Sequence, residues 1–98
     1  MKVHISTKVL AKLSEKHGVT RKEVEECFQN RTGHLLMETR EQHKSDPPTL
    51  WFIAHTNKGR LLKVCLVLKG GQPHIRTAYS PNDIELGLYR NKGKPSDF

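Results

Sequence analysis

The sequence predicts an α+β fold with the element order β-α-α-β-β-β-β-α. Apolar residues recur at three- and four-residue spacing near the two ends of the chain, which indicates helices. In the middle the period changes to two, and the turns there are short. We therefore expect a curved antiparallel sheet whose helices all pack on one face and leave the other face partly open.

Two helices are predicted in the amino-terminal third, after a short extended segment over residues 2–5. A serine or threonine caps the first helix and a glycine ends it, and a capping box opens the second. The residues that bound these helices are Ser6 or Thr7, Gly18, Thr20 with Glu23, and Asn30. Their apolar faces consist of Val9, Leu10, Leu13, Val24, Cys27 and Phe28.

Four strands are predicted from alternation and from β-branched and aromatic residues. They cover residues 34–40, 49–56, 62–68 and 72–79. A polar loop at 41–48 and glycine-containing turns at 57–60 and 69–72 separate them. In the third strand, one strongly buried face is formed by Leu62, Val64, Leu66 and Leu68.

The last helix is predicted to begin at Ser80, which would cap it. Pro81 would occupy its first position, and Asp83 would add an acidic group near its amino end. Ile84 and Leu88 would form its apolar face.

The chain has 98 residues, enough for one modest hydrophobic core and too few for two. We therefore predict a single domain over residues 1–90 and a flexible basic tail over residues 91–98. No apolar run approaches the ~20 residues of a membrane-spanning helix, and the amino terminus lacks an export core, so a cytoplasmic protein is expected. Cys27 and Cys65 lie in separate apolar stretches and are expected to be reduced core residues.

Charge indicates the class of partner. The chain contains 17 Lys and Arg against 10 Asp and Glu, a net charge of +7. Residues 1–57 hold nine basic and seven acidic residues (+2), and residues 58–98 hold eight and three (+5). A polyanion is therefore the expected partner, with RNA or another nucleic acid first. The alternative is a merely soluble basic surface.

Several short motifs resemble the BrnT toxin family. Its KHGV element and the helix that follows are similar to Lys16-His17-Gly18-Val19, Glu23-Val24 and Phe28. Its three sheet strands are similar to residues 51–56, 59–67 and 74–76, so that the resemblance spans roughly residues 3–90. Where that family has Ser-Ala-Arg after its strand arginine, this chain has Thr77-Ala78-Tyr79-Ser80-Pro81. That ending is more similar to the Thr-Ala-Tyr-Pro of other ribonucleases in the barnase, EndoU, colicin and RelE group.

The resemblance implies a RelE/BrnT-like fold and a toxin with metal-independent endoribonuclease activity, which needs no cofactor. It also implies that a cognate antitoxin or immunity protein neutralises the toxin. The BrnT motifs suggest His17 and Arg76 as site residues, and the Thr-Ala-Tyr ending suggests Thr77 and Tyr79.

Metal-free RNA cleavage uses the ribose 2′-hydroxyl as nucleophile, so a protein need supply only a base, an acid and positive charge. Histidine, tyrosine and arginine suit these roles. The candidate catalytic residues are Arg76, Tyr79, Thr77, His17, His55 and His74. The candidate RNA-binding residues are Lys58, Arg60, Lys63, Lys69 and Arg90. His17 at a helix carboxyl end is explained equally well as a structural cap.

Strand parity limits which candidates can act together. In a regular strand His74 and Arg76 point to one face and Thr77 and Tyr79 to the other, unless a bulge before Pro81 brings them together. The six histidines include no HxH or HxxxH spacing, and no metal site is predicted. A non-catalytic basic module that binds nucleic acid or an acidic protein partner is the alternative function.

Overall fold

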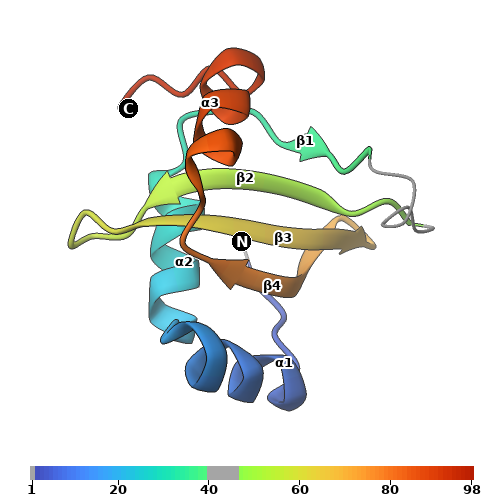
Figure 1. The fold of residues 1–98 in the computed structure, drawn as a ribbon. Helices are drawn as coiled ribbons and strands as arrows, with labels where there is room; N and C mark the ends of the chain where they lie inside the picture. Colours follow the sequence, from blue (N-terminus) through green and yellow to red (C-terminus); the bar gives the residue numbers. More distant parts are fainter. Residues whose placement is uncertain (1, 40–46) are drawn as a thin grey trace.

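A computed structural model describes residues 2–39 and 47–98 and has an α+β architecture (Figure 1). Its antiparallel sheet has four strands in the order β1-β2-β3-β4. The strands are β1 (Leu36–Met37), β2 (Leu50–His55), β3 (Leu61–Lys69) and β4 (Gln72–Tyr79). The helices are α1 (Thr7–Lys12), the π-helix η1 (Leu13–His17), α2 (Arg21–Asn30) and α3 (Asp83–Lys92).

The predicted boundaries of the first two helices are confirmed. The Ser6 hydroxyl caps α1 by accepting a hydrogen bond from the Val9 amide at 3.1 Å. The helix continues without a break into the wider turns of η1 and ends at Gly18, whose φ of 61° lies in the left-handed region that glycine adopts without strain. Thr20 and Glu23 form the predicted capping box of α2.

The strands are confirmed in the second half of the chain and are shorter than predicted in the first. The extended segment at residues 2–5 makes a single parallel bridge, in which His4 pairs with His74 of β4. The strand predicted at 34–40 is reduced to β1, although the last of its residues lies outside the described part. Most of the predicted loop at 41–48 also lies outside the described residues.

The prediction that all helices pack on one face of the sheet is wrong. Phe28 of α2 packs edge-on against Phe52 of β2 with ring centroids 4.9 Å apart, whereas Tyr89 of α3 lies 5.6 Å from Trp51. Trp51 and Phe52 are neighbours in one strand and point to opposite faces, so α2 and α3 lie on opposite sides (Figure 1). For the same reason β3 is buried on both faces from Leu62 to Val67, not on one.

The α3 helix begins later than predicted. Asn82, not Ser80, is its cap: the Asn82 side chain accepts from the Glu85 amide at 2.8 Å, and the Glu85 carboxylate accepts from the Asn82 amide at 3.0 Å. Pro81 therefore precedes the cap. This capping box fixes the Glu85 side chain next to the end of β4.

The predicted apolar face of α3 is also wrong. Ile84 and Leu88 are 82% and 42% exposed, and Tyr89 is the fully buried residue of the helix. The Tyr89 hydroxyl donates to the His34 carbonyl at 2.8 Å, which satisfies its one polar atom inside the core. A buried tyrosine therefore attaches α3 to the sheet.

The segment after α3, predicted to be a flexible tail, contacts the body of the protein. The Ser96 amide donates to the Thr32 hydroxyl at 3.0 Å, and that hydroxyl donates to Asp97 at 2.7 Å. The Phe98 ring stacks on Tyr89 with centroids 6.1 Å apart. These contacts place the tail over the loop that follows α2.

Both cysteines are buried and form no disulfide, as predicted. The Cys27 thiol donates to the Ala54 carbonyl at 3.5 Å. Burial, together with the nearby carboxylates of Glu23 and Glu26, raises the pKa of Cys27 to about 12. Among the residues that the structure describes, no helix is long and apolar enough to cross a bilayer.

Candidate active site at the β4 edge

The edge strand β4 contains a β-bulge at Arg76. Cys65 of β3 is opposite Thr77, but the next residue, Leu66, is opposite Ile75, so Arg76 has no partner across the ladder. Bulges of this kind are over-represented at sheet edges and beside active sites, where they redirect a side chain. A bulge before Pro81, which the sequence left open as one way to bring the candidates together, is therefore present.

The extra residue changes which side chains share a face. Thr77 and Tyr79 lie opposite residues of β3 that point toward the α3 side, and His74, on the other side of the bulge, points to the same face. Arg76 is exposed. In the part of the chain described here, its guanidinium forms no hydrogen bond or ion pair.

The carboxyl end of η1 brings a histidine to Tyr79. The rings of His17 and Tyr79 have centroids 5.7 Å apart and are tilted by 38°. Arg60 holds this helix end in place by donating to the His17 carbonyl at 3.0 Å and to the Gly18 carbonyl at 2.9 Å. Arg60, predicted to bind RNA, is therefore engaged in positioning the His17 turn.

Tyr79 is oriented by a carboxylate and an ammonium group. Its hydroxyl donates to Glu85 Oε2 at 2.8 Å, and Lys63 Nζ donates to the same oxygen at 2.8 Å. The lysine Nζ also lies 4.5 Å from the centroid of the Trp51 ring. Sequence reasoning missed Glu85; the Asn-x-x-Glu capping-box spacing was the signal that could have found it.

These contacts determine the charge states of the three groups. Burial would lower the pKa of Lys63, but the hydrogen bond to Glu85 together with charge interactions with Cys65, Tyr79 and Glu85 outweighs burial and raises it. Burial would raise the pKa of Glu85, yet hydrogen bonds from Lys63, the Asn82 amide and Tyr79 lower it. Burial and then the Glu85 hydrogen bond raise the pKa of Tyr79. Near neutral pH the site therefore holds an ammonium, a carboxylate and a protonated phenol.

Lys63 does not belong to the exposed basic surface. Its side chain is 4% exposed and is enclosed by the ring of Trp51 and the carboxylate of Glu85. The sequence made Lys63 a candidate for RNA binding. In the structure it is buried, and its ammonium group donates a hydrogen bond to Glu85.

The two other candidate histidines are engaged away from this edge. His55 Nδ1 lies 3.1 Å from Asp97 Oδ2, and its ring lies edge-on to Phe98 at 5.3 Å. His74 stacks on His4 with centroids 4.5 Å apart, about 16 Å along β4 from Tyr79 at the usual rise per strand residue. Of the three candidate histidines, His17 is the one whose ring contacts the tyrosine.

The remaining candidate RNA-binding residues are spread over the surface. Lys58 is exposed in the turn between β2 and β3, and Lys69 is exposed at the opposite end of β3. The guanidinium of Arg90 in α3 lies 6.0 Å from the centroid of the Phe98 ring. The structure does not bring these three residues into one patch.

A groove of about 380 Å³ separates β1 from α3. Exposed apolar side chains form much of its wall, and the ion pair between Lys63 and Glu85 forms another part. Its lining includes Met37, Trp51, Lys63, Ile84, Glu85 and Leu88. The groove was not predicted, because Ile84 and Leu88 had been assigned to the core.

Two further observations bear on function. Within residues 2–39 and 47–98, no group of three His, Cys, Asp or Glu side chains is arranged to hold a metal ion. The chain matches no protein-family model and no curated protein. Function is therefore inferred from the geometry at the β4 edge, from charge and from the motif resemblance.

Proposed function

We propose that this protein is a toxin with metal-independent endoribonuclease activity. One edge of its sheet presents the three kinds of group that the reaction needs. The His17 imidazole contacts the Tyr79 ring, and the unpaired guanidinium of Arg76 lies on the same strand, about 10 Å before the tyrosine. The ring contact between His17 and Tyr79 is the observation that carries the proposal.

In the proposed reaction, the imidazole of His17 accepts the proton of a ribose 2′-hydroxyl, and the 2′-oxygen attacks the adjacent phosphorus. The guanidinium of Arg76 neutralises the charge that develops on the phosphate oxygens, with the Thr77 hydroxyl as a further donor. The phosphorus–oxygen bond to the 5′-oxygen breaks, and the Tyr79 phenol gives this oxygen its proton. The products are a 2′,3′-cyclic phosphate and a 5′-hydroxyl.

Glu85 and Lys63 position the phenol in this proposal. The Glu85 carboxylate accepts the Tyr79 hydrogen bond, and Lys63 keeps that carboxylate ionised from the buried side. The raised pKa of Tyr79 keeps the phenol protonated until the leaving oxygen requires the proton.

The proposal is tested by incubating the purified protein with total RNA in EDTA and mapping the ends. We expect fragments that carry 2′,3′-cyclic phosphate, and about a hundredfold slower cleavage by Arg76→Ala, in line with the loss of one electrostatic donor. Lys22→Ala on α2 removes one exposed positive charge elsewhere and is the matched control. Cleavage that requires a divalent metal, or equal rates for both variants, would refute the mechanism.

The unpaired Arg76 and the exposed Lys58 also fit a non-catalytic basic module that binds nucleic acid or an acidic partner. In that case RNA stays intact and is bound with a strong salt dependence, because release of counterions needs no chemistry. The same incubation therefore separates the two functions.

The α+β architecture and the sequence motifs together support a RelE/BrnT-like fold assignment, action on RNA in the cytoplasm, and neutralisation by a cognate antitoxin or immunity protein. Expression should then arrest growth, and Arg76→Ala should relieve the arrest at equal protein level. Growth at the normal rate with the wild-type chain would count against the toxin assignment.

A further inference from the structure

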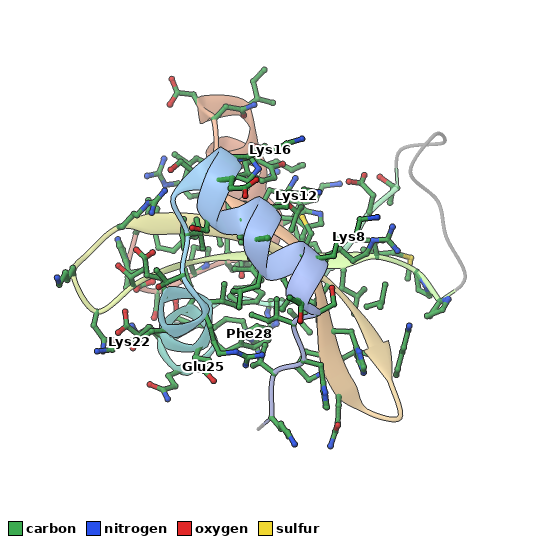
Figure 2. The ribbon with its side chains drawn as sticks, turned by 90° about the horizontal axis from the view of Figure 1, so that it is seen from below. Lys8, Lys12, Lys16, Lys22, Glu25 and Phe28 are labelled. Carbon is green, nitrogen blue, oxygen red and sulfur yellow. The ribbon has the colours of Figure 1, made fainter. Side chains whose placement is uncertain are left out.

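The helix formed by α1 and η1 carries a row of three lysines that have no ion-pair partner among the described residues. Lys8, Lys12 and Lys16 are exposed, and the structure gives none of them an ion-pair or hydrogen-bond partner among the described residues. Figure 2 shows the three side chains along one side of the helix. Glu15 is the single acidic residue between Thr7 and His17.

Helix geometry explains why the three lysines stay in line. Four residues exceed one turn of an α-helix by about 40°, so an i, i+4, i+8 row would wind slowly around it. The π turns of η1 are wider and take more than four residues, which reverses part of this winding after residue 13. Lys8 and Lys12, both in α1, are about 6 Å apart along the axis, a spacing comparable with that of adjacent phosphates in an extended strand.

The row leads to the candidate active site. Lys16 directly precedes His17, whose ring contacts Tyr79, and η1 packs beside β4, the strand that carries Arg76. A chain of phosphates lying along the three ammonium groups would therefore continue to the histidine and the unpaired guanidinium. Lysines act as point charges and do not read base edges, so this contact would be independent of sequence.

We propose that Lys8, Lys12 and Lys16 form a track for the phosphate backbone of single-stranded RNA, which delivers the strand to the β4 edge. This inference rests on the proposed function and specifies how its substrate is held. A single strand is required because its bases can be turned out while its backbone follows the helix. An acidic protein partner is the competing occupant.

The test measures binding and not cleavage. The probe is a fluorescent 2′-O-methyl oligouridine of roughly 12 nucleotides, within the range of single-strand site sizes. It has no free 2′-hydroxyl, so it cannot be cut. Binding is titrated at several salt concentrations for the wild type, for the track variant Lys8→Gln/Lys12→Gln/Lys16→Gln and for a control variant. The control, Lys22→Gln/Lys92→Gln/Lys94→Gln, removes the same charge from exposed positions on α2 and around the end of α3.

We expect the track variant to bind about tenfold more weakly or worse at low salt, with a log–log salt slope shallower by about 2, since each single-strand phosphate contact contributes about 0.7. The control should change the slope by much less. Equal losses in the two variants would show a net-charge effect and overturn the track. Unchanged binding by the track variant would also overturn it.

Two additions keep the outcome decisive. Polyglutamate of similar length is titrated in parallel, and if it binds as tightly and depends equally on the three lysines, the surface fits an acidic protein instead.

Should the triple variant not fold, judged by circular dichroism, Lys12→Gln alone is expected to reduce the slope by about 0.7. Absence of RNA cleavage by the wild type would refute the proposed function, and would leave this binding result to be judged separately.

Discussion

The imidazole of His17 lies against the ring of Tyr79, with centroids 5.7 Å apart, although the two residues are far apart in the sequence. The η1 turns bring His17 to the sheet edge, and the bulge at Arg76 turns Tyr79 to the face from which the Glu85 carboxylate can hold it. This contact puts an imidazole and a phenol, the proposed base and proton donor, at one place on the edge strand.

Removal of either group should therefore reduce RNA cleavage. We expect His17→Asn to lower the rate by about 10²- to 10⁴-fold, the usual contribution of a positioned acid or base. Tyr79→Phe keeps the ring and removes the proton, so it should be about as slow as Tyr79→Ala. His74→Asn, remote from the site, serves as the control. Full activity of Tyr79→Phe would show that the ring only stacks a base and does not donate.

Lys63→Met should destabilise the protein strongly, because it leaves the Glu85 carboxylate without its buried counter-charge. We expect the free energy of unfolding in urea to fall by about 3 kcal/mol, as when one partner of a buried ion pair is removed. Lys58→Met, in an exposed turn, should change it by less than about 0.5 kcal/mol. Adding Glu85→Gln to Lys63→Met should recover part of the loss; no recovery would mean that lost packing causes the effect.

Stability should decrease on the acid side of neutrality in a way that depends on Glu85. The pKa of Glu85 in the folded protein is below its ordinary value of 4.5, so the unfolded chain takes up this proton first as pH falls. The contribution of Glu85 is present above pH 4.5 and is lost as pH falls through the lowered pKa. Urea unfolding of Glu85→Gln should show a smaller loss between about pH 5 and pH 3 than the wild type. Identical pH profiles would contradict the assigned hydrogen bonds.

Two glycines should respond to alanine in opposite directions. At Gly33 a Cβ atom would lie 2.5 Å from the Tyr89 hydroxyl and 2.9 Å from the Gly93 carbonyl, so Gly33→Ala should cost about 1–3 kcal/mol. At Gly87, inside α3, the Cβ would meet no atom within 4 Å, and Gly87→Ala should stabilise the fold by about 0.5–1 kcal/mol. Urea midpoints measure both changes. Stabilisation by Gly33→Ala would show that α3 does not pack as described.

The Cys27 thiol should be unreactive in the folded protein, because its pKa is about 12 and its side chain is fully buried. In a Cys65→Ala background, an aromatic disulfide reagent at about pH 8 should modify Cys27 only after urea is added. Rapid reaction without denaturant would mean that α2 opens readily from β2.

Local chemistry made much of the fold predictable. Gly18, the Thr20 capping box and the Gly70-Gly71 turn before β4 act between residues close in sequence, and the structure confirms them. The start of α3 was misassigned because Ser80 and Asn82 are both competent caps, and only the position of Glu85 chooses between them.

The sequence by itself determined the ends of the first two helices, the order of the four strands that follow them and of the last helix, the excess of positive charge and the residue types available for chemistry, because these depend on neighbouring residues. The tertiary structure decided which of those residues meet. The bulge at Arg76 depends on how β4 pairs with β3, and the burial of Lys63 depends on α3 crossing to the second face of the sheet. Pairing register and helix placement are set by packing between distant segments. The sequence motifs could therefore suggest Arg76, Tyr79 and His17 as candidates, but not that His17 contacts Tyr79 or that Glu85 accepts the Tyr79 hydrogen bond.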